Sequence, residues 1–271
     1  MEFIKLYNAI IYHPLLNLLV FFYNIIPGHD VGIVIIVLTI FIRLLLAPSF
    51  HKSLKSQKAM NDLQPKLTEL RQKYKGDKEG EAKAMMQLYK DHKINPLSSC
   101  APLLLQLPIL IGLYQAFRVA LNPAIDISTR LQGLYPFVHR PESISPYFLH
   151  FLNLSQPSII LGVIAGVAQF WQSKLMMPKT AGQDATTKAM QMQTTYVLPV
   201  VSMIIAIRLP AGLPLYWIVT TLFAVGQQYY ILRTKGEYLP GFARGGTAVY
   251  GIFKKQNPNK DPEAPIEKYK K

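Results

Sequence analysis

The sequence has little charge for its length and only one cysteine. Charged residues make up 16% of the 271 residues, whereas a soluble domain normally carries about 25%. The single cysteine, Cys100, excludes a disulfide framework within the chain. Half of the residues are hydrophobic, and the mean hydropathy is +0.18. This composition indicates a membrane protein.

The long apolar stretches contain no acidic residue and no histidine. All 15 Asp and Glu residues and all 6 histidines lie outside them. A transporter coupled to protons or cations is expected to carry acidic residues there, and an intramembrane hydrolase needs H-E-x-x-H or a serine with a base. A G-x-x-x-x-G-K-[ST] nucleotide loop is missing too. We therefore expect no enzymatic activity, no cofactor and no metal.

Five apolar stretches are long enough to cross a bilayer as helices. Such a span needs roughly 17 to 25 residues, and a helix satisfies its own backbone polar groups in lipid. The sequence predicts an all-α polytopic membrane protein with spans at Val31 to Ala47, Leu97 to Leu121, Ser158 to Met177, Thr194 to Leu209 and Leu213 to Leu232. The Pro210-Ala211-Gly212 sequence predicts a tight turn that joins the last two spans as a hairpin.

The N-terminal region, residues 1–30, contains a shorter apolar stretch from Leu15 to Ile26. Asn17 and Asn24 lie seven residues apart and therefore on one helical face. Twelve helical residues reach about 18 Å, less than the hydrocarbon core of about 30 Å. We expect an amphipathic helix in the outer interface. The alternative is an uncleaved, signal-like segment that inserts as an additional span.

Basic residues are distributed unevenly between the connections. Residues 48–96 hold eleven Lys and Arg against six acidic residues, and residues 233–271 hold nine against four. Residues 122–157 hold only Arg130 and Arg140, balanced by Asp126 and Glu142. The positive-inside rule then predicts a cytoplasmic first connection and C-terminus and an external N-terminus. The positive charge also favours contact with anionic lipids.

The first connection, residues 49–96, has the pattern of a helical hairpin. Two runs at helical spacing flank the polar turn KGDKEG, and they are Leu63, Leu67, Leu70 and Tyr74, then Ala82, Met85, Met86 and Tyr89. Pro65 should kink or restart the first arm. Residues 235–271 are predicted to be a basic, disordered cytoplasmic tail. The alternative for this tail is contact with ribosomal RNA through its lysines.

Polar residues recur inside the spans at similar depths. Arg43 lies within the apolar run TIFIRLLLAP, about 6 Å from the cytoplasmic end of its helix. Five glutamines on three other spans fall roughly 6 to 14 Å deep in the same half of the membrane, and they are Gln106, Gln169, Gln172, Gln227 and Gln228. Amides and a guanidinium at one depth are costly in lipid and favourable when they face water or each other. The sequence predicts a hydrophilic inner-leaflet pocket, the alternative being that Arg43 snorkels to the headgroups.

Six segments, taken in order, resemble the successive signatures of one family. They are TIFIRLLLAP, QPKLTELRQKYKGD, INPLSSCAPLLLQLPILIGLYQAF, LNLSQPSII, QSKLM and LPAGLPLYWIVTTLFAVGQQYYILR. Together, over about Leu15 to Arg233, they are similar to the YidC/Oxa membrane protein insertase family. The resemblance implies a core of five spans at residues 31–234, a cytoplasmic helical hairpin after the first span, and a positively charged groove that is closed toward the outside.

The resemblance also implies roles for single residues. Arg43 matches the groove arginine of the family, and Gln172 matches a glutamine that lines the groove in Gram-positive-type members. Tyr216 and Trp217 match an aromatic pair on the path of the incoming segment. From the residues alone, this pair has the alternative of being belt aromatics near the outer interface.

The sequence departs from the family pattern at three points. Thr220 and Thr221 stand where Ser-Asn is common, so we expect Thr221 to line the groove as a hydrogen-bonding residue. A large extracytoplasmic β-domain and a lipoprotein cysteine near the N-terminus are not found in the sequence. The resemblance is therefore to a compact bacterial version that resides in the plasma membrane.

The implied activity is insertion of hydrophobic segments of nascent proteins from the cytoplasm into the bilayer. Nascent membrane proteins are then the substrates, and the Sec translocon and the ribosome are the further partners that the resemblance suggests. Two alternatives use the same residues. A carrier of small anions could bind its solute at Arg43, and a passive scaffold could assist the assembly of other membrane proteins.

Overall fold

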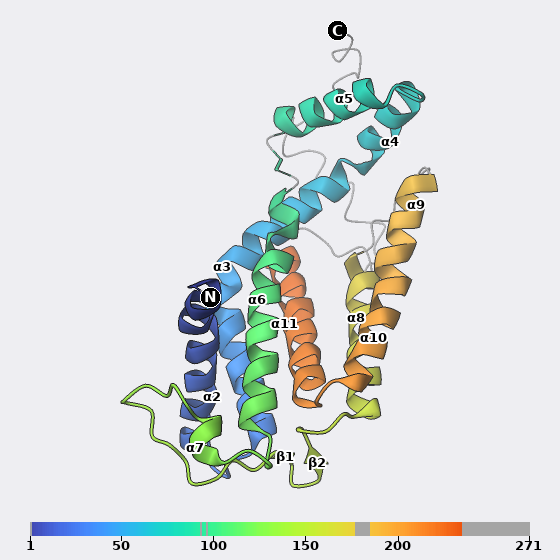
Figure 1. Cartoon of the computed structure of the whole chain (residues 1–271). Coiled ribbons are helices and arrows are strands. Elements are labelled where there is room, and N and C mark those ends of the chain that lie inside the picture. Colours follow the sequence, from blue (N-terminus) through green and yellow to red (C-terminus); the bar gives the residue numbers. More distant parts are fainter. Residues whose placement is uncertain (1, 93, 96, 177–184, 235–271) are drawn as a thin grey trace.

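The computed structural model describes residues 2–92, 94, 95, 97–176 and 185–234, and these are mostly helical (Figure 1). The strands of the described residues, β1 (Tyr147–Phe148) and β2 (Leu152–Asn153), form one short antiparallel pair. The all-α fold is therefore confirmed. The predicted tail, residues 235–271, lies outside the described residues, as does Met177 at the end of the third predicted span.

Each of the five predicted spans is helical. The helices are α3 (Val31–Asp62), α6 (Leu97–Ala120), α8 (Ile159–Met176), α10 (Leu198–Arg208) and α11 (Gly212–Thr234). α11 packs against both α3 and α8, while α6 packs against α3 and α10 against α8 (Figure 1). We call the end of this bundle that lies near residues 121–158 the loop end. The opposite end, where α3 leads to α4 and α5, is the hairpin end.

The N-terminal region is one continuous helix rather than the short segment predicted. It comprises α1 (Glu2–Tyr7), a π-helical turn η1 (Asn8–Tyr12) and α2 (His13–Ile25). The prediction took Pro14 as a boundary, but the wider π turn accommodates the proline inside the helix. The segment Ile4–Ile25 has 22 residues and is long and apolar enough to cross a membrane. The argument that this helix is too short to cross is therefore wrong.

The N-terminal helix crosses α6 obliquely. The Tyr7 hydroxyl donates to the Pro108 carbonyl at 3.1 Å, so this end of the helix lies beside the middle of α6. Gly112 permits the close approach, because a Cβ there would lie 2.9 Å from Leu15 Cδ1. The helix rises about 27 Å from Tyr7 to Ile25, whereas α6 rises about 18 Å from Pro108 to Ala120. The interfacial location of residues 1–30 stays a prediction.

The fourth predicted span begins earlier than Thr194. α9 (Ala185–Met192), the π turn η2 (Gln193–Val197) and α10 follow one another without a break. In η2 the Leu198 N–H donates to the Gln193 carbonyl, directly before Pro199. η1 precedes Pro14 in the same way, with the His13 N–H donating to the Asn8 carbonyl. The chain thus uses a π turn twice to continue a helix into a proline.

The helical hairpin forms, but its boundaries differ from the prediction. α3 continues through Pro48 to Asp62 and does not end at Ala47. α4 (Gln64–Lys73) then restarts with Pro65 in its first turn, as predicted, and α5 (Lys78–Asp91) packs against it. The buried residues of this pair are Leu63, Leu67, Thr68, Leu70, Ala84 and Leu88. The predicted face of the second arm was partly wrong, since Ala82 and Met86 are exposed and Leu88 was missed.

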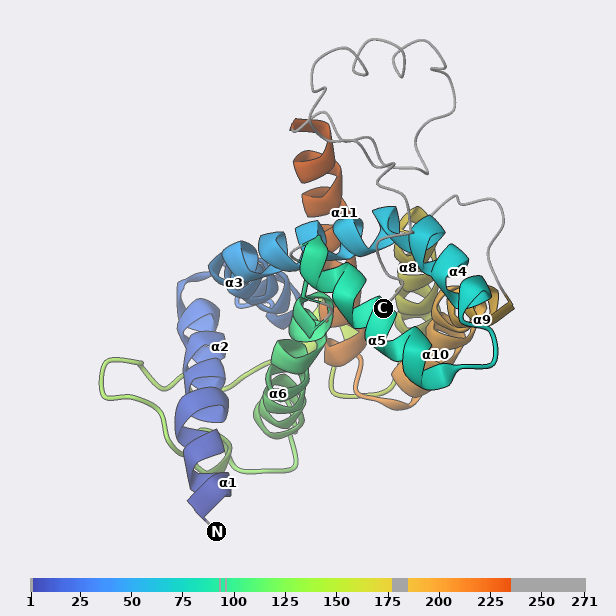
Figure 2. The ribbon, with the colours of Figure 1, turned by 90° about the horizontal axis from the view of Figure 1, so that it is seen from above.

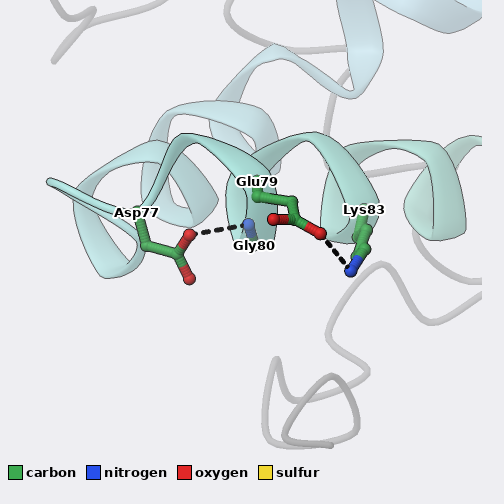
Figure 3. Close-up of polar contacts among 4 residues, drawn as sticks. All are labelled: Asp77, Glu79, Gly80 and Lys83. Carbon is green, nitrogen blue, oxygen red and sulfur yellow. Dashed lines mark hydrogen bonds and ion pairs between the residues drawn. The ribbon is translucent and has the colours of Figure 1, made fainter.

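Local polar contacts support the second arm of the hairpin. Asp77 Oδ1 accepts the Gly80 N–H at 2.9 Å and so caps α5, while Lys83 pairs with Glu79 at 2.6 Å on the exposed surface (Figure 3). Arg71 of α4 pairs with Glu81 of α5 at 3.6 Å and links the two arms. The hairpin therefore has its own small core and caps, separate from the core of the bundle.

The loop end of the bundle is a continuous apolar core. Its fully buried members include Leu16, Val20, Val34, Ile35, Leu113, Leu121 and Leu154. The predicted turn between α10 and α11 is confirmed and is attached to the 121–158 loop. The Ala211 N–H donates to the Gln156 carbonyl at 2.9 Å and the Gly212 N–H to the Leu154 carbonyl at 3.1 Å. Backbone pairing and apolar burial together close this end.

Residues of the 121–158 loop also cap the helix ends beside it. The buried side chain of Arg130, at the end of α7 (Ile127–Arg130), donates to the Ala120 carbonyl at 3.1 Å. A cation at this position complements the negative end of the α6 dipole. Asp126 caps α7, and hydrogen bonds from Ser128 hold the pKa of its carboxyl below the usual value.

α8 and α10 make the closest helix contact in which glycine takes part. A Cβ on Gly162 would lie 2.6 Å from Ile207 Cγ1 and 2.8 Å from the Ile207 backbone nitrogen, and one on Gly166 would lie 2.6 Å from Met203 Cβ. The two glycines form a G-x-x-x-G pair, which lets helix backbones approach in membranes. This feature of the sequence was not recognised before the structure was known.

Within the part of the chain that the structure describes, two helices are long and apolar enough to be candidate membrane spans, Ile4–Ile25 and Val31–Asp62. Shorter apolar helices cover Leu104–Ala120, Ile159–Leu175 and Gln193–Arg208. The helical architecture is compatible with a membrane protein, and the number of spans and their orientation stay predictions.

Candidate functional site

Arg43 lies inside the bundle and not on its outer surface. It is in the middle part of α3, and only 7% of it is exposed. Its guanidinium carbon is 4.4 Å from the centre of the Phe50 ring, two helical turns closer to the hairpin end. Among the residues that the structure describes, no carboxylate forms an ion pair with Arg43. The buried charge is therefore compensated by an aromatic face and by neutral polar groups.

Tyr216 and Gln106 connect Arg43 to two further helices. Tyr216 of α11 is 2% exposed, and its side chain is close enough to Arg43 to interact with it electrostatically. Its hydroxyl accepts a hydrogen bond from the amide of Gln106 on α6. We call Arg43, Phe50, Gln106 and Tyr216 the Arg43 cluster. Three helices thus meet at one polar centre, on the hairpin side of the apolar core.

The burial of Tyr216 argues against its role as a belt aromatic. A belt aromatic places its ring at the membrane surface, whereas Tyr216 is enclosed by the bundle. The turn before α11 is covered by residues 154–157, so the start of this helix is recessed from the loop end. Trp217, the next residue, is half-buried and packs against the apolar core.

Polar residues continue along α11 toward the hairpin end. Thr220, Thr221 and Gln228 are buried, and Gln227 is half-buried. The Gln227 amide donates to the Ala47 carbonyl of α3 at 3.4 Å. Thr221 and Gln228 are seven residues apart and share one face of α11. The predicted residues of this helix therefore lie in the interior of the bundle.

The two glutamines of α8 are half-buried and lie three residues apart, on adjoining parts of the helix surface. Gln172 lies on the face that carries the buried residues Leu161, Ala165, Ala168 and Leu175. Gln169 lies three residues after Gly166, on the side that packs against α10. One hydrogen bond joins Gln106 to Tyr216 and another joins Gln227 to Ala47. Neither glutamine of α8 takes part in these two bonds.

Two contributors to the site were missed in the sequence. Phe50 was not considered, although an aromatic residue seven positions after an arginine shares its helical face. Thr39, one turn before Arg43, is also buried, and its hydroxyl donates to the Ile35 carbonyl at 2.6 Å. The described residues include no group of three or more His, Cys, Asp or Glu side chains that could hold a metal ion.

The magnitudes indicate that Arg43 needs further polar contact. An arginine at the centre of a membrane helix costs about 2.5–3.5 kcal/mol on insertion scales, and a cation–π contact returns about 0.5–2 kcal/mol. Tyr216 is a further electrostatic partner of the guanidinium. Water or an anionic group that enters from the hairpin end would offset the remainder. The arrangement can bind a negative or polar group.

Known proteins resemble this chain over most of its length. The model of the family described as 60Kd inner membrane protein matches residues 21–237. Membrane protein insertase YidC of Syntrophus aciditrophicus is 38% identical over 220 residues, which are 80% of this chain and 35% of that protein. The proteins of the same name from Pelobacter propionicus and Geobacter sulfurreducens are 37% and 36% identical over 82% and 83% of this chain. The chain spans little more than a third of the length of these relatives.

Proposed function

Because the chain belongs to the 60Kd inner membrane protein family, the YidC/Oxa family that its motifs predicted, we propose that it inserts apolar segments of nascent proteins into the lipid bilayer. The relatives that it matches are named membrane protein insertases. The proposed location is the bacterial plasma membrane, with five spans, an external N-terminus and a cytoplasmic C-terminus. The N-terminal helix then lies obliquely in the outer leaflet.

One observation carries this proposal: the buried guanidinium of Arg43 has no carboxylate partner among the described residues and sits above a closed apolar core. A polar flank of an arriving chain can reach it from the hairpin end, where Thr221, Gln227 and Gln228 continue the polar path along α11. The apolar core at the loop end blocks onward leakage of water and ions. The groove thus shortens the distance over which polar groups must cross hydrocarbon.

In the proposed mechanism the apolar part of the substrate supplies the driving force. An arriving chain contacts the helical hairpin, its acidic flank is attracted to Arg43, and the groove hydrates that flank. Its apolar segment passes Tyr216 and Trp217 and partitions into lipid along α8 and α11, where each fully buried large side chain contributes about 1.5–3 kcal/mol. A membrane potential, negative inside, favours outward movement of acidic flanks. No nucleotide is needed in this scheme.

The proposed partners are those of a protein that receives chains during synthesis. Nascent membrane proteins are the substrates, and anionic lipids contact the basic cytoplasmic face. We include the Sec translocon and the ribosome as further partners, the latter through the hairpin and the basic tail. The basic residues of the hairpin are largely exposed, Lys73, Lys75, Lys78 and Lys83 among them, and are therefore accessible to a partner.

The test is insertion of single-span substrates into liposomes that contain only this protein. Substrates should come in pairs that differ in acidic or neutral residues in the translocated flank. In the Arg43→Ala variant, insertion of the acidic-flank substrate should fall roughly tenfold, since a hydrogen bond to a charged group contributes about 1.5–3 kcal/mol. The neutral-flank substrate should be affected less. Arg118→Ala, which removes an exposed arginine of α6, is the charge-matched control.

The same liposomes separate insertion from the two alternatives. Full insertion of every acidic-flank substrate by the Arg43→Ala variant would remove Arg43 from the mechanism. Saturable flux of a small anion without any polypeptide substrate would identify a carrier. Binding of membrane proteins without their insertion would identify a scaffold. A photocrosslinker at position 217 should react with a stalled nascent chain only if Trp217 lies on the insertion path.

A further inference from the structure

The most exposed large apolar side chains of the described residues lie in the 121–158 loop. Phe137 is 77% exposed and Phe151 is 75% exposed, and Tyr147 and Leu149 are exposed beside Phe151. Single exposed apolar residues are common on protein surfaces. Here, however, they lie at two sites, one with Leu149 and Phe151 and the other with Phe137 alone, and the chain holds each site in a fixed position. This positioning calls for an explanation.

The first site, Leu149 and Phe151, is held in a strained backbone. Leu149 and His150, between β1 and β2, have φ angles of +49° and +67°, which non-glycine residues rarely adopt. Such strain persists only where surrounding contacts impose it. The carboxylate of Asp30 accepts the Leu149 N–H at 2.6 Å while it also caps α3 by accepting the Ile33 N–H at 3.1 Å. The apolar tip is thus fixed to the first turn of α3.

Packing beneath the tip adds a second support. The Phe148 ring lies directly over Gly32, where a Cβ would be 2.0 Å from Phe148 Cδ2. Phe148 therefore turns inward against α3, while Leu149 and Phe151 face outward. Gly32 and the buried carboxylate of Asp30 therefore determine that Phe148 faces inward and that Leu149 and Phe151 face outward.

The second site is Phe137, which the N-terminal helix holds from both sides. The Asn17 side chain accepts the Tyr135 N–H at 2.6 Å, and the Asn24 side chain donates to the His139 carbonyl at 2.6 Å. The Tyr135 and Phe137 rings are 5.5 Å apart. The two asparagines of one helical face therefore bracket the exposed phenylalanine.

Further exposed apolar residues follow the loop. Ile159 and Ile160, which open α8 directly after the loop, are 68% and 71% exposed and continue the apolar surface. The part of the loop that follows α7 extends sideways past α2 and not away from the bundle along its axis (Figures 1 and 2). Arg140, in the same part, is exposed and can reach a phosphate.

We propose that Phe137 and the Leu149–Phe151 tip are interfacial anchors that insert into the headgroup and upper acyl region of the leaflet at the loop end. Aromatic rings are favoured at this depth, and rigid presentation lowers the entropy lost on insertion. The partner is a lipid surface, because exposed apolar residues at the start of α8 follow the tip along the chain and the loop after α7 extends past α2 at the side of the bundle (Figures 1 and 2). This inference does not depend on the insertion activity.

The test places an environment-sensitive fluorophore on single cysteines in the full chain. Cys100→Ser provides the background, and Phe137→Cys, Phe151→Cys and Glu142→Cys provide the labelling positions. Position 142, an exposed loop residue, reports whether the dye inserts on its own. In pure lipid vesicles, shallow lipid-borne nitroxides should quench the label at positions 137 and 151 several-fold more than at 142. A water-soluble quencher should show the reverse order.

Two variants test the supports separately. Asp30→Ala should release the label at position 151 into water while the label at 137 keeps its lipid contact, and Asn24→Ala should do the opposite. Equal access of the water-soluble quencher to all three positions would overturn the proposal. Shielding of positions 137 and 151 in native membranes but not in pure lipid would also overturn it, because a protein would then be the partner.

Discussion

The two ends of the helical bundle differ in the side chains that fill their interiors. At the loop end, side chains from α2, α3, α6 and α11 form one apolar core, and the 121–158 loop is joined to it by backbone hydrogen bonds. Toward the hairpin end, the interior contains Arg43, Gln106, Thr221 and Gln228 instead. The helices themselves run through both regions. Side-chain chemistry and not helix arrangement therefore distinguishes the closed end from the polar end.

This contrast has an energetic meaning. An apolar core in a membrane gains packing energy but little hydrophobic energy, so small residues and backbone connections are needed to fix it. A polar interior is stable only if its groups are paired or hydrated. The closed end should therefore respond to changes of volume, whereas the polar end should respond to changes of hydrogen bonding and charge. Four sets of substitutions can break or sharpen this distinction.

The largest effect is expected for Gly162→Ala at the loop end of α8. The added Cβ would lie 2.8 Å and 2.9 Å from backbone atoms of Ile207, which cannot move without separating α8 from α10. We expect a loss of roughly 1–3 kcal/mol in the free energy of unfolding, as for other overpacked sites. Unfolding by denaturant in mixed micelles measures this change.

Gly226→Ala in α11 is the matched control for this substitution. A Cβ at Gly226 has no atom within 4 Å among the described residues, so only helix propensity should act. Alanine is favoured over glycine in a helix by about 1 kcal/mol. The control should therefore be unchanged or slightly stabilised. Equal stabilisation by both substitutions would show that α8 and α10 are not tightly packed.

The next effect concerns two aspartates that cap helices at opposite ends of the molecule. Asp30 is buried and accepts two backbone N–H groups, whereas Asp77 is exposed and accepts the Gly80 N–H (Figure 3). Asp30→Ala should lower the free energy of unfolding by about 1–2 kcal/mol. Asp77→Ala should lower it by less than about 1 kcal/mol and should affect only the hairpin. Hydrogen exchange measured by mass spectrometry separates the two regions, and a larger loss for Asp77→Ala would contradict the contrast.

How much of this architecture the sequence predicts depends on the physical signal involved. Long apolar runs located the five helices of the bundle, because hydropathy reflects the requirement to satisfy backbone groups in lipid. The predicted helix boundaries at Pro14 and Thr194 were wrong. A π turn can continue a helix past a proline, and no residue type in the sequence marks such a turn. The prediction that a helix restarts at Gln64-Pro65 was correct, because the proline lies in the first turn of α4.

The candidate site was predictable in kind but not in detail. The depth of Arg43 and of the glutamines follows from counting along each helix, and burial of Arg43, Gln228 and Thr221 agrees with an interior location. Rotation about the helix axes is not fixed by depth, so the sequence did not show that Gln169 lies on the side of α8 that carries Gly166 and faces α10. The partnership of Tyr216 with Gln106 depends on the recessed start of α11, and this recess is created by the distant loop residues 154–157.

A smaller effect is expected from the hydrogen bond between Gln106 and Tyr216. Tyr216→Phe and Gln106→Leu each remove one partner, and the double variant removes both. If the bond is independent of other contacts, the coupling free energy should be about 0.5–1.5 kcal/mol. The free energies of unfolding of the wild type, the two single variants and the double variant, measured in detergent, form a double-mutant cycle that gives this coupling. A coupling of zero would mean that the two side chains are hydrated separately, and the polar end would then be wetter than its burial indicates.

The smallest effect tests whether the Phe50 ring holds the guanidinium of Arg43. The ring lies 4.4 Å from the guanidinium carbon, a distance at which the π face attracts the cation. Phe50→Trp should retain insertion of acidic-flank substrates, and Phe50→Leu should lower it by roughly two- to fivefold, which corresponds to about 0.5–1 kcal/mol for such a contact. Leucine preserves apolar volume, so a loss identifies the π face as the cause.

Phe170 offers the control for this contact, because its ring lies 5.8 Å from the Lys174 ammonium at the hairpin end of α8. Phe170→Leu removes a cation–π contact of the same kind outside the Arg43 cluster and should leave the ratio of acidic-flank to neutral-flank insertion unchanged. Equal activity of Phe50→Leu and the wild type would reduce Phe50 to a space-filling residue. A selective loss on acidic flanks would instead mean that the orientation of a single guanidinium, and not the net positive charge of the protein, sets the preference of the polar end.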